Sequence, residues 1–435
     1  MLSHSLRQSI LLASAATLSV VVMSNPVMAS AFQLKEDSAV GLGTAFAGAG
    51  SSAETPSTVF DNPAGMTKLD GLQIQLGSTL IAPQFTFHGT STNAFGRPNS
   101  GQDGRNGGTL ALVPNGYVTY KVTPDLTVGL ALTSPFGLAT NYGSNFVGRY
   151  NADKTDLRTI NINPAIAYQV TPWLSVGAGI SAQYGSAEFS TDINSSTIAT
   201  SLLRRPTSLP DGYFRLKGDD WAVGYNFGVL IEPTQTTKIG ITYRSRVQHE
   251  FSGTAEYVVP SPLSLSNSFR NSGGNAKVVL PDTAGVSITQ VITPAWTGYA
   301  DLNWTNWEQF KTLNAFRDDG TLINSTPQHY RNSFFISAGA SYKWNDALTL
   351  RAGTAFDQSP VSNTYRTARV PDQDRLWLAI GASYKVMANL TLDAGYAHIF
   401  VRDSQISETS STSDKLVGSY KSSIDLFSLG ARMKF

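Results

Sequence analysis

The stretch Val170–Tyr184, VTPWLSVGAGISAQY, contains the two features that decide the fold. It begins with a short Thr-Pro-Trp segment and continues as an alternation of apolar residues with small or polar ones. Successive side chains of a β-strand point to opposite faces, so the alternation predicts a strand with one apolar face and one small or polar face. The same alternation returns at residues 376–386 and 390–397. A soluble β-sandwich and a membrane β-barrel both fit this pattern alone.

Short turns between the alternating runs favour the barrel. Three of them contain a Thr-Pro pair, in which proline fixes φ for a tight turn. These are Val122–Leu126, Val170–Leu174 and Ile292–Trp296, and three more short turns are expected at Glu232-Pro233, Asn345-Asp346 and Ala388-Asn389. Long connections rich in Gly, Ser and Asn lie between successive short turns. Short turns at one end and long loops at the other are typical of outer-membrane barrels.

The turns also give the number of strands. Six short turns join twelve strands, and one further strand precedes the first turn and another follows the last, which makes fourteen. The first strand is expected at about Gly71–Phe87 and the last at about Ser422–Phe435, where Phe427 to Phe435 place an aromatic or apolar residue at every second position. The predicted fold class is therefore all-β, a 14-stranded antiparallel transmembrane β-barrel. A soluble all-β protein that happens to end in Phe is the alternative.

The start of the chain predicts export. Arg7 precedes an apolar run from Ile10 to Met23, and Val27-Met28-Ala29 forms a small-residue cleavage site, so residues 1–29 read as a secretory signal peptide. Cleavage after Ala31 is also acceptable. The apolar run is shorter than the ~20 residues that a membrane-spanning helix needs, which disfavours a membrane anchor.

Composition excludes several other classes. The 435-residue chain has a formal net charge of +1 and no cysteine, so it predicts neither a nucleic-acid-binding surface nor a disulfide framework. The sequence contains no H-E-x-x-H, G-x-S-x-G or P-loop motif, and its five His are scattered. We therefore expect no enzyme activity, no catalytic residues, no cofactor and no metal site.

Residues Ser30–Leu69 do not follow the strand alternation. They are rich in glycine and small residues and include Asn62-Pro63-Ala64. Because a fourteen-stranded barrel is too wide for side chains alone to fill, this segment is predicted to be a hatch inside the lumen; a periplasmic tail is the alternative. The expected domains are a signal peptide at 1–29, a hatch at 30–69 and a barrel at 70–435.

The alternation of side chains between the two faces of a strand also predicts which charged residues face the lumen. If Ile239, Ile241, Tyr243 and Val247 face outward, Arg244 and Arg246 face inward. The same reasoning places three further charged residues in the lumen: Arg351, Asp357 and Arg375. Two interpretations are open. These residues form a hydrated row of charges on the barrel wall that contacts the hatch, or one or two of them contact the head group of an anionic ligand.

Several motifs along the mature chain resemble the FadL/TodX family of outer-membrane transporters. They start with Ala31-Phe32-Gln33-Leu34, the Gly-Leu-Gly at 41–43 and Asn62-Pro63-Ala64. They continue as SPFGLAT at 134–140, TYRS at 242–245, LPD at 280–282, WTNW at 304–307, AFDQSP at 355–360 and PDQDR at 371–375. These matches occur in family order over essentially the whole mature sequence.

The resemblance implies uptake of hydrophobic molecules, most simply long-chain fatty acids, with monoaromatic hydrocarbons as the TodX-like alternative. It implies a hatch with Phe32 at its start and Asn62, Pro63 and Ala64 in its motif. It also implies a lateral exit at a kink in the third strand, where Gly137 and Phe136 lie. Glycine suits such a site because it tolerates bulge geometry and interrupts strand pairing. Asp357 is expected as an inward acid near the hatch and the kink.

One departure concerns the head group of the ligand. The segment Gly185–Asp192, where the family carries a basic residue, contains none, so Arg244, Arg366, Arg369 or Arg375 would have to replace it. The expected partners are a hydrophobic ligand together with lipid and lipopolysaccharide of a Gram-negative outer membrane, and a monomer is expected because a closed barrel has no free edge. A general porin or a surface receptor that uses the long loops is the alternative function.

Overall fold

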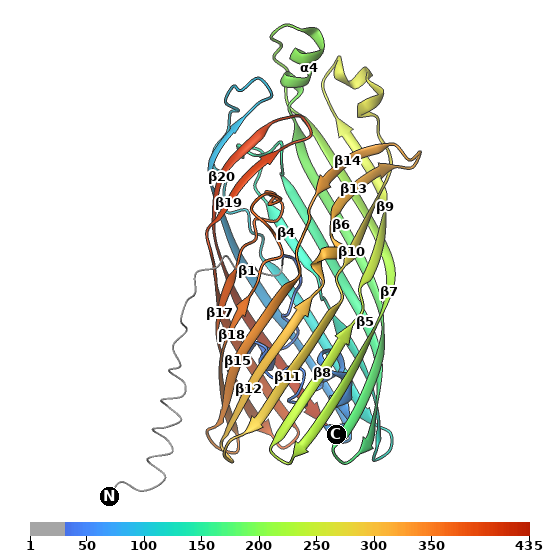
Figure 1. Cartoon of the computed structure of the whole chain (residues 1–435), viewed down its shortest axis with the longest axis vertical. Coiled ribbons are helices and arrows are strands. Elements are labelled where there is room, and N and C mark those ends of the chain that lie inside the picture. Colours follow the sequence, from blue (N-terminus) through green and yellow to red (C-terminus); the bar gives the residue numbers. More distant parts are fainter. Residues whose placement is uncertain (1–30) are drawn as a thin grey trace, which may run out of the picture.

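The computed structural model describes residues 31–435; the predicted signal peptide, residues 1–29, and its cleavage site after Ala29 lie outside the described residues. Strands of the described chain form one closed antiparallel barrel, with short turns at one end and long loops at the other (Figure 1). Fourteen strands make up the wall, and six of them are interrupted, so that the chain contains twenty strand segments.

Eight strands are continuous: β1 (Leu72–Thr92), β2 (Ala111–Lys121), β5 (Lys154–Thr171), β6 (Leu174–Ile193), β7 (Gly212–Thr234), β16 (Leu348–Asp357), β17 (Arg375–Met387) and β20 (Lys415–Lys434). Six are interrupted: β3 (Leu126–Thr133) with β4 (Gly137–Asn141), β8 (Thr237–Arg244) with β9 (Val247–Val258), β10 (Ser272–Leu280) with β11 (Thr283–Val291), β12 (Trp296–Thr305) with β13 (Thr312–Arg317), β14 (Leu322–Pro327) with β15 (Ser333–Lys343), and β18 (Leu390–Val401) with β19 (Ser404–Thr409). Antiparallel pairing of β1 with β20, from Gln73 opposite Lys434 to Thr92 opposite Lys415, closes the barrel.

Three predicted boundaries differ from the structure. The first and last strands extend further toward the long-loop end than expected, because the polar upper halves of β1 and β20 pair with each other although they lack the apolar alternation. The turn expected at Glu232-Pro233 lies three residues later, at Gln235-Thr236, and the Pro belongs to the end of β7. The other short turns lie where they were predicted.

The apolar face of the strands is the outer one. In β6, Val176 and Ile180 are exposed on the outside, whereas Ser175, Ser181 and Gln183 are buried inside. Exposed apolar side chains on the other strands continue this outer surface, as expected for strands that contact lipid. Among residues 31–435, no helix has both the length and the apolar character needed to cross a membrane.

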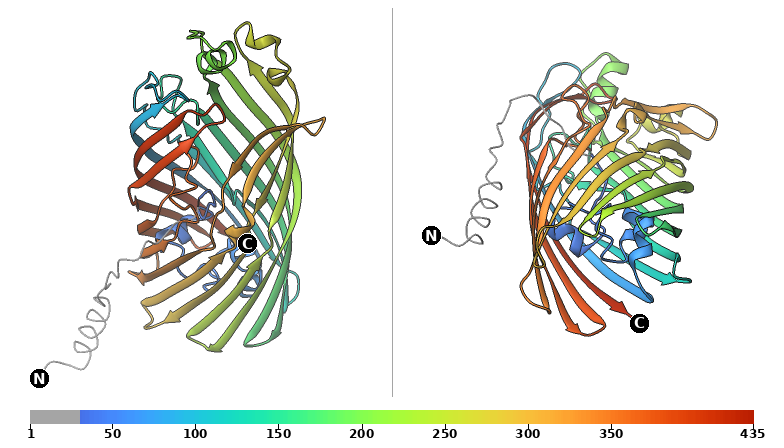
Figure 2. Two further views of the ribbon diagram at one scale, coloured as in Figure 1. Left: turned by 45° about the horizontal axis from the view of Figure 1, so that its top comes forward. Right: turned by 60° about the horizontal axis from the view of Figure 1, so that its bottom comes forward.

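Residues Ala31–Asp70, which we call the plug, lie inside the ring of strands (Figure 2). The plug contains α2 (Ala39–Gly43), α3 (Thr58–Asp61) and the short 3₁₀ helix η1 (Pro63–Lys68). Glycines of the wall let its backbone approach closely: a Cβ atom on Gly240 would lie 1.9 Å from the Gly50 carbonyl oxygen, and one on Gly381 would lie 2.7 Å from Gly43 Cα. The glycines of the alternating strands therefore make room for the plug.

Four short helices complete the described chain. The α4 helix (Ser195–Leu203) follows β6 at the long-loop end, and η2 (Leu263–Leu265) and η3 (Asn267–Phe269) follow β9 (Figure 1). The η4 helix (Trp307–Gln309) interrupts the strand made of β12 and β13.

Candidate functional site

A cavity of about 880 Å³ lies on the long-loop side of the plug. Its lower wall is apolar and includes Leu138, Leu157, Phe189, Leu216, Val278 and Phe310. Its upper wall contains hydroxyl groups between Ser407 and Ser413 together with the arginines Arg366 and Arg369. A cavity that is apolar at one end and polar at the other suits an elongated amphiphile.

The plug supplies the floor of this main cavity through Phe32. The Phe32 ring packs edge-on against Trp307 and Phe310, with centroid distances of 4.8 and 5.7 Å, and lies 6.4 Å from Phe136. Trp307 is fully buried at the η4 interruption between β12 and β13. Each aromatic pair adds about 0.5–1.5 kcal/mol beyond its buried area, so this cluster holds the plug's first residues in place.

The wall beside this cluster has a gap. The β3 segment pairs with both β2 and β5, but β4 pairs only with β5 among the described strand pairings. Residues Ala111–Asn115 of β2 pair with β1 and with no residue of β4. The wall closes again above the gap, where Gly108 lies opposite Thr140. Phe136 and Gly137, expected at a kink of the third strand, lie at the edge of this gap.

The plug fills the pairing position that β2 leaves open. Phe136 directs its own backbone groups toward β5, because its carbonyl accepts from the Thr159 N–H at 3.2 Å. Neighbouring residues of a strand alternate in direction, so the Pro135 carbonyl and the Gly137 N–H point toward β2. The first accepts a hydrogen bond from Leu34 N at 2.9 Å, and the second donates to the Phe32 carbonyl at 3.0 Å. Plug residues, not a barrel strand, therefore complete the sheet at the gap.

A buried charged cluster anchors the beginning of the plug. The Ala31 N–H donates to Asp372 at 2.9 Å, and Asp372 also accepts from Ser359 at 2.7 Å and from Arg375 at 2.6 Å. The Arg375 guanidinium lies 3.8 Å from the Asp357 carboxylate. Burial raises the pKa of Asp372, and Arg375 opposes that rise. Asp357 and Arg375 thus lie beside the start of the plug.

The same cluster extends to the plug residue Glu36. Burial raises the pKa of Glu36 to about 7, against the opposing effect of backbone hydrogen bonds and of Arg375. A carboxyl group of this kind is largely neutral below that pH, which lowers the cost of burying it inside the barrel.

The Asn62-Pro63-Ala64 motif ties the plug to the wall. The Asn62 side-chain amide donates to the Gly50 carbonyl at 2.6 Å and to the Val229 carbonyl of β7 at 3.0 Å. Its oxygen accepts from Ala64 N at 3.1 Å and caps η1, which begins at Pro63. Asn62 is fully buried, so these bonds join two plug segments to one strand without contact with the main cavity.

The other charged residues that strand alternation predicted to face the lumen contact the plug or the wall. Arg244 donates to the Phe60 carbonyl at 2.7 Å and lies 3.8 Å from the centre of the Phe60 ring. Arg351 donates to Ser383 at 2.6 Å and lies 4.0 Å from Glu54 of the plug. Arg244, Arg351, Asp357 and Arg375 do not line the main cavity.

The placement of Arg246 in the lumen was wrong. Its side chain is exposed and donates to Gln309, whereas Val247, expected to face outward, is buried in the apolar cluster around Phe32. The strand is interrupted at Ser245 and Arg246 between β8 and β9, and this break shifts the alternation by one residue.

Arg369 has a different environment from the other buried arginines. Its guanidinium donates to the carbonyls of Lys154 and Ser190, at 3.0 and 2.9 Å, and to the Thr155 hydroxyl at 3.1 Å. Among the described residues, no carboxylate lies within hydrogen-bond or ion-pair distance of it. Burial lowers its pKa. A cation with neutral partners on the wall of an apolar cavity is suited to an anionic group.

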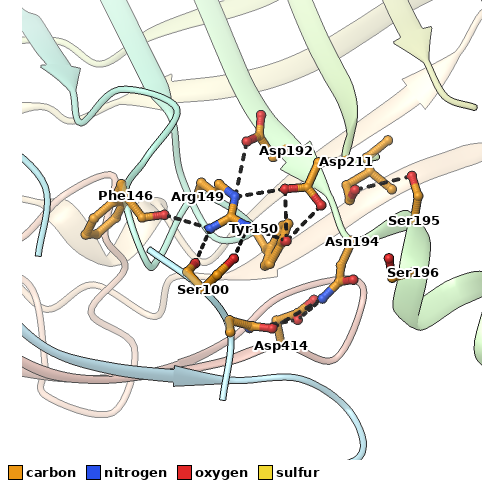
Figure 3. Close-up of polar contacts among 12 residues, drawn as sticks. Ser100, Phe146, Arg149, Tyr150, Asp192, Asn194, Ser195, Ser196, Asp211 and Asp414 are labelled. Carbon is orange, nitrogen blue, oxygen red and sulfur yellow. Dashed lines mark hydrogen bonds and ion pairs between the residues drawn. The ribbon is translucent and has the colours of Figure 1, made fainter. Parts of the chain in front are cut away.

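A polar network joins the long loops around the upper part of the cavity (Figure 3). Arg149 lies 2.9 Å from Asp211 and 3.5 Å from Asp192, and the Tyr150 hydroxyl donates to Asp211 at 2.8 Å. Asn194, which caps α4, donates to the buried Asp414 at 2.7 Å. These contacts join loops that are far apart in sequence, so hydrogen bonds and ion pairs between loops stabilise the upper wall of the cavity.

Sequence reasoning missed Trp307 and Phe310 as the aromatic residues that pack against Phe32 at the cavity floor. The WTNW stretch at 304–307 was noted as a motif, but nothing in its local pattern indicates that η4 turns Trp307 inward against the plug. Of the four arginines named as possible head-group contacts, Arg366 and Arg369 line the main cavity, and Arg244 and Arg375 lie against the plug.

A closed barrel with an apolar outer surface, a plugged lumen and a largely apolar cavity defines an outer-membrane channel for hydrophobic compounds. The chain belongs to the outer membrane protein transport protein family (OMPP1/FadL/TodX), whose model matches residues 20–435. This family consists of transport channels and places the protein in the outer membrane.

Individual relatives agree with this assignment. The chain is 30% identical to the long-chain fatty acid transport protein of Escherichia coli O6:H1 over 89% of this chain and 90% of that protein. It is 33% identical to a 47 kDa outer membrane protein of Pasteurella multocida, over 98% of each. A FadL homologue of Pseudomonas aeruginosa has a similar structure, with a TM-score of 0.88, 25% identity and coverage of 93% of this chain and 100% of that one. The Ralstonia pickettii toluene transporter TbuX shares the fold, with a TM-score of 0.68, 20% identity and coverage of 92% and 99%.

Proposed function

We propose that this protein takes up long-chain fatty acids across the Gram-negative outer membrane and releases them sideways into the bilayer. The wall gap between β2 and β4 carries the proposal, because plug residues alone complete the sheet there. In this account residues 30–69 act as the hatch and residues 70–435 as the barrel, which works as a monomer surrounded by lipid and lipopolysaccharide. Uptake needs no chemical energy source and runs down the concentration gradient of the ligand.

The energetics suit an apolar path. Burying one methylene group is worth about 0.8 kcal/mol, so a sixteen-carbon chain gains on the order of 10 kcal/mol before the costs of ordering are counted. The lower wall of the main cavity supplies that apolar surface, and Phe32 separates it from the gap. Displacement of Phe32 and its neighbours by the ligand would join the cavity to the gap and expose the acyl chain to the membrane.

Arg369 favours a fatty acid as the cargo. A buried cation that hydrogen-bonds only to neutral groups, and that Glu408 and Asp153 attract only from beyond ion-pair distance, gives a carboxylate a charge-assisted contact that a neutral hydrocarbon cannot make. The relatives named as long-chain fatty acid transport proteins support the same choice. For monoaromatic hydrocarbons, the alternative cargo, the aromatic rings around Phe32 would provide the main contact.

Substitution of Gly137 tests the lateral exit. A Cβ atom at this position would lie 2.9 Å from Leu34 Cδ1 at the edge of the gap, so the branched side chain in Gly137→Ile would occupy the proposed passage. We expect this variant to bind oleate at the wild-type level but to lose most oleate uptake, measured with radiolabelled oleate in a strain without its own fatty acid transporter. The matched control, Gly137→Ala, adds one methyl group and should keep most of the uptake. Wild-type uptake by Gly137→Ile would exclude the lateral route.

A further inference from the structure

Three small cavities lie within and around the plug, below the main cavity, with volumes of about 110, 70 and 30 Å³. The first and second share Lys35, Asp37 and Asp61 as lining residues, and the second and third share Asp61 and Ala49. The three cavities therefore adjoin one another in a series.

The series runs toward the short-turn end of the barrel. Glu54, whose side chain is 41% exposed, lines the third cavity. The nearby Ser52 carbonyl accepts a hydrogen bond at 3.1 Å from Lys238, the second residue of β8 after the short turn. The first cavity, at the other end of the series, is lined by Gln33 and Phe136 directly beneath the floor of the main cavity.

Buried polar atoms without a partner face these cavities. Among the described residues, both side-chain polar atoms of Asn161 and the Asn226 amide nitrogen lack a hydrogen-bond partner, and both residues line the first cavity. The same holds for one carboxylate oxygen each of Asp37 and Asp301, which line the second cavity. Asn161, Asn226 and Asp301 are 1%, 2% and 6% exposed. Such groups are costly unless a polar solute or ion meets them.

Acidic side chains line all three cavities. Asp37, Asp61 and Asp301 line the second cavity, and Asp61 and Glu54 line the third. Arg244 also borders the first cavity, where it contacts the Phe60 ring and carbonyl and interacts electrostatically with Asp37 and Asp61. Lys35 and Arg351 are the other cations of the lining. Rings of acidic side chains in a narrow passage favour cations over anions.

We propose that these three cavities form a narrow route for small monovalent cations through the plug, separate from the path of the hydrophobic ligand. Its upper end is closed by the layer of Phe32 and Phe136, so movement of Phe32 opens it to the main cavity. An ion in the main cavity cannot leave through the lateral gap, because the gap faces hydrocarbon and the transfer of an ion into hydrocarbon is energetically costly. Ion current must therefore pass through the plug, whatever the hydrophobic cargo is.

Planar-bilayer recording with the full-length protein tests this route. The variant Phe32→Ala removes the ring that closes the upper end. In a potassium chloride gradient we expect it to carry a steady current, larger than that of the wild type, with a reversal potential displaced toward the potassium equilibrium potential. A current no larger than that of the wild type, or a reversal potential displaced toward the chloride side, would overturn the proposal.

Removal of the acids identifies the path. In the Phe32→Ala background, Asp61→Asn with Asp301→Asn should shift the reversal potential toward zero, whereas Asp346→Asn, at a fully exposed turn residue, should not. An unchanged reversal potential in the double Asn variant would contradict the route. If that variant does not fold, Glu54→Gln at the exposed end of the series provides the same test. In otherwise wild-type protein, Asp61→Asn with Asp301→Asn should still take up oleate, so failure of the cation route is distinguishable from failure of fatty acid uptake.

Discussion

A disulfide between positions 33 and 136 is expected to abolish fatty acid uptake, and its reduction is expected to restore it. Gln33 and Phe136 lie opposite each other in an antiparallel bridge whose hydrogen bonds are made by the flanking residues. Pairs of this kind have Cα atoms about 4.5 Å apart, within the range of about 4.4–6.8 Å that a disulfide requires. The link in Gln33→Cys with Phe136→Cys would hold the first residues of the plug in the gap, so a bound ligand could not reach the bilayer.

The chain contains no cysteine, so the pair can be introduced without competing thiols. The measurement is uptake of labelled oleate by whole cells before and after treatment with a reducing agent, with each single Cys variant as a control. The oxidised double variant should fall to the level of cells without the transporter, and the single variants should be insensitive to the reducing agent. Full uptake by protein whose disulfide is verified would show that the plug's first residues do not have to move.

The variant Arg369→Met is expected to lower the affinity for oleate by about tenfold to a hundredfold. Hydrogen bonds to charged groups contribute about 1.5–3 kcal/mol, which corresponds to that range. Arg369 donates its hydrogen bonds to neutral groups, and Glu408 and Asp153 act on it only by attraction from beyond ion-pair distance. Oleyl alcohol has the same chain without the charge, so its affinity should change little. Equilibrium binding to purified protein in detergent gives both values.

Three controls separate loss of charge from loss of structure. Arg369→Lys keeps the positive charge and should weaken oleate binding less than Arg369→Met. Arg97→Met removes an exposed arginine from the loop after β1 and should have no effect. Toluene should compete for the cavity equally well in wild type and Arg369→Met, because it has no carboxylate. Equal losses of oleate and oleyl alcohol binding would assign Arg369 a purely structural role.

The barrel could be predicted because its signals are local. Alternation within a strand and proline in a short turn act over a few residues. Short turns such as Val170–Leu174 therefore predicted both the number of strands and the end of the barrel at which the long loops lie. The outer face could be predicted from the same period of two, as the exposed Phe427 and Leu429 of the last strand illustrate. Resemblance to a family added the expectation of an irregularity near Gly137, where the structure has the interruption between β3 and β4.

The site was harder to predict because it depends on interruptions and on contacts between distant residues. One break at Ser245 and Arg246 reversed the orientation of everything that follows it in β9, which a strict alternation cannot anticipate. The gap in the wall is a missing pairing between β2 and β4, and no single segment encodes it. Arg369 reaches the cavity from the connection between β16 and β17. Side chains in such a loop do not alternate between two faces, so their direction cannot be predicted from a period of two.

The most direct test of sideways release is a structure of the protein in a lipid environment with a long-chain fatty acid bound. We expect the carboxylate within hydrogen-bond distance of Arg369, the acyl chain along the apolar wall of the main cavity, and Phe32 displaced so that the chain end enters the opening between residues 111–115 and Gly137. An acyl chain that instead passes through the plug cavities beside Asp61 and Asp301 toward the periplasm would contradict release through the wall.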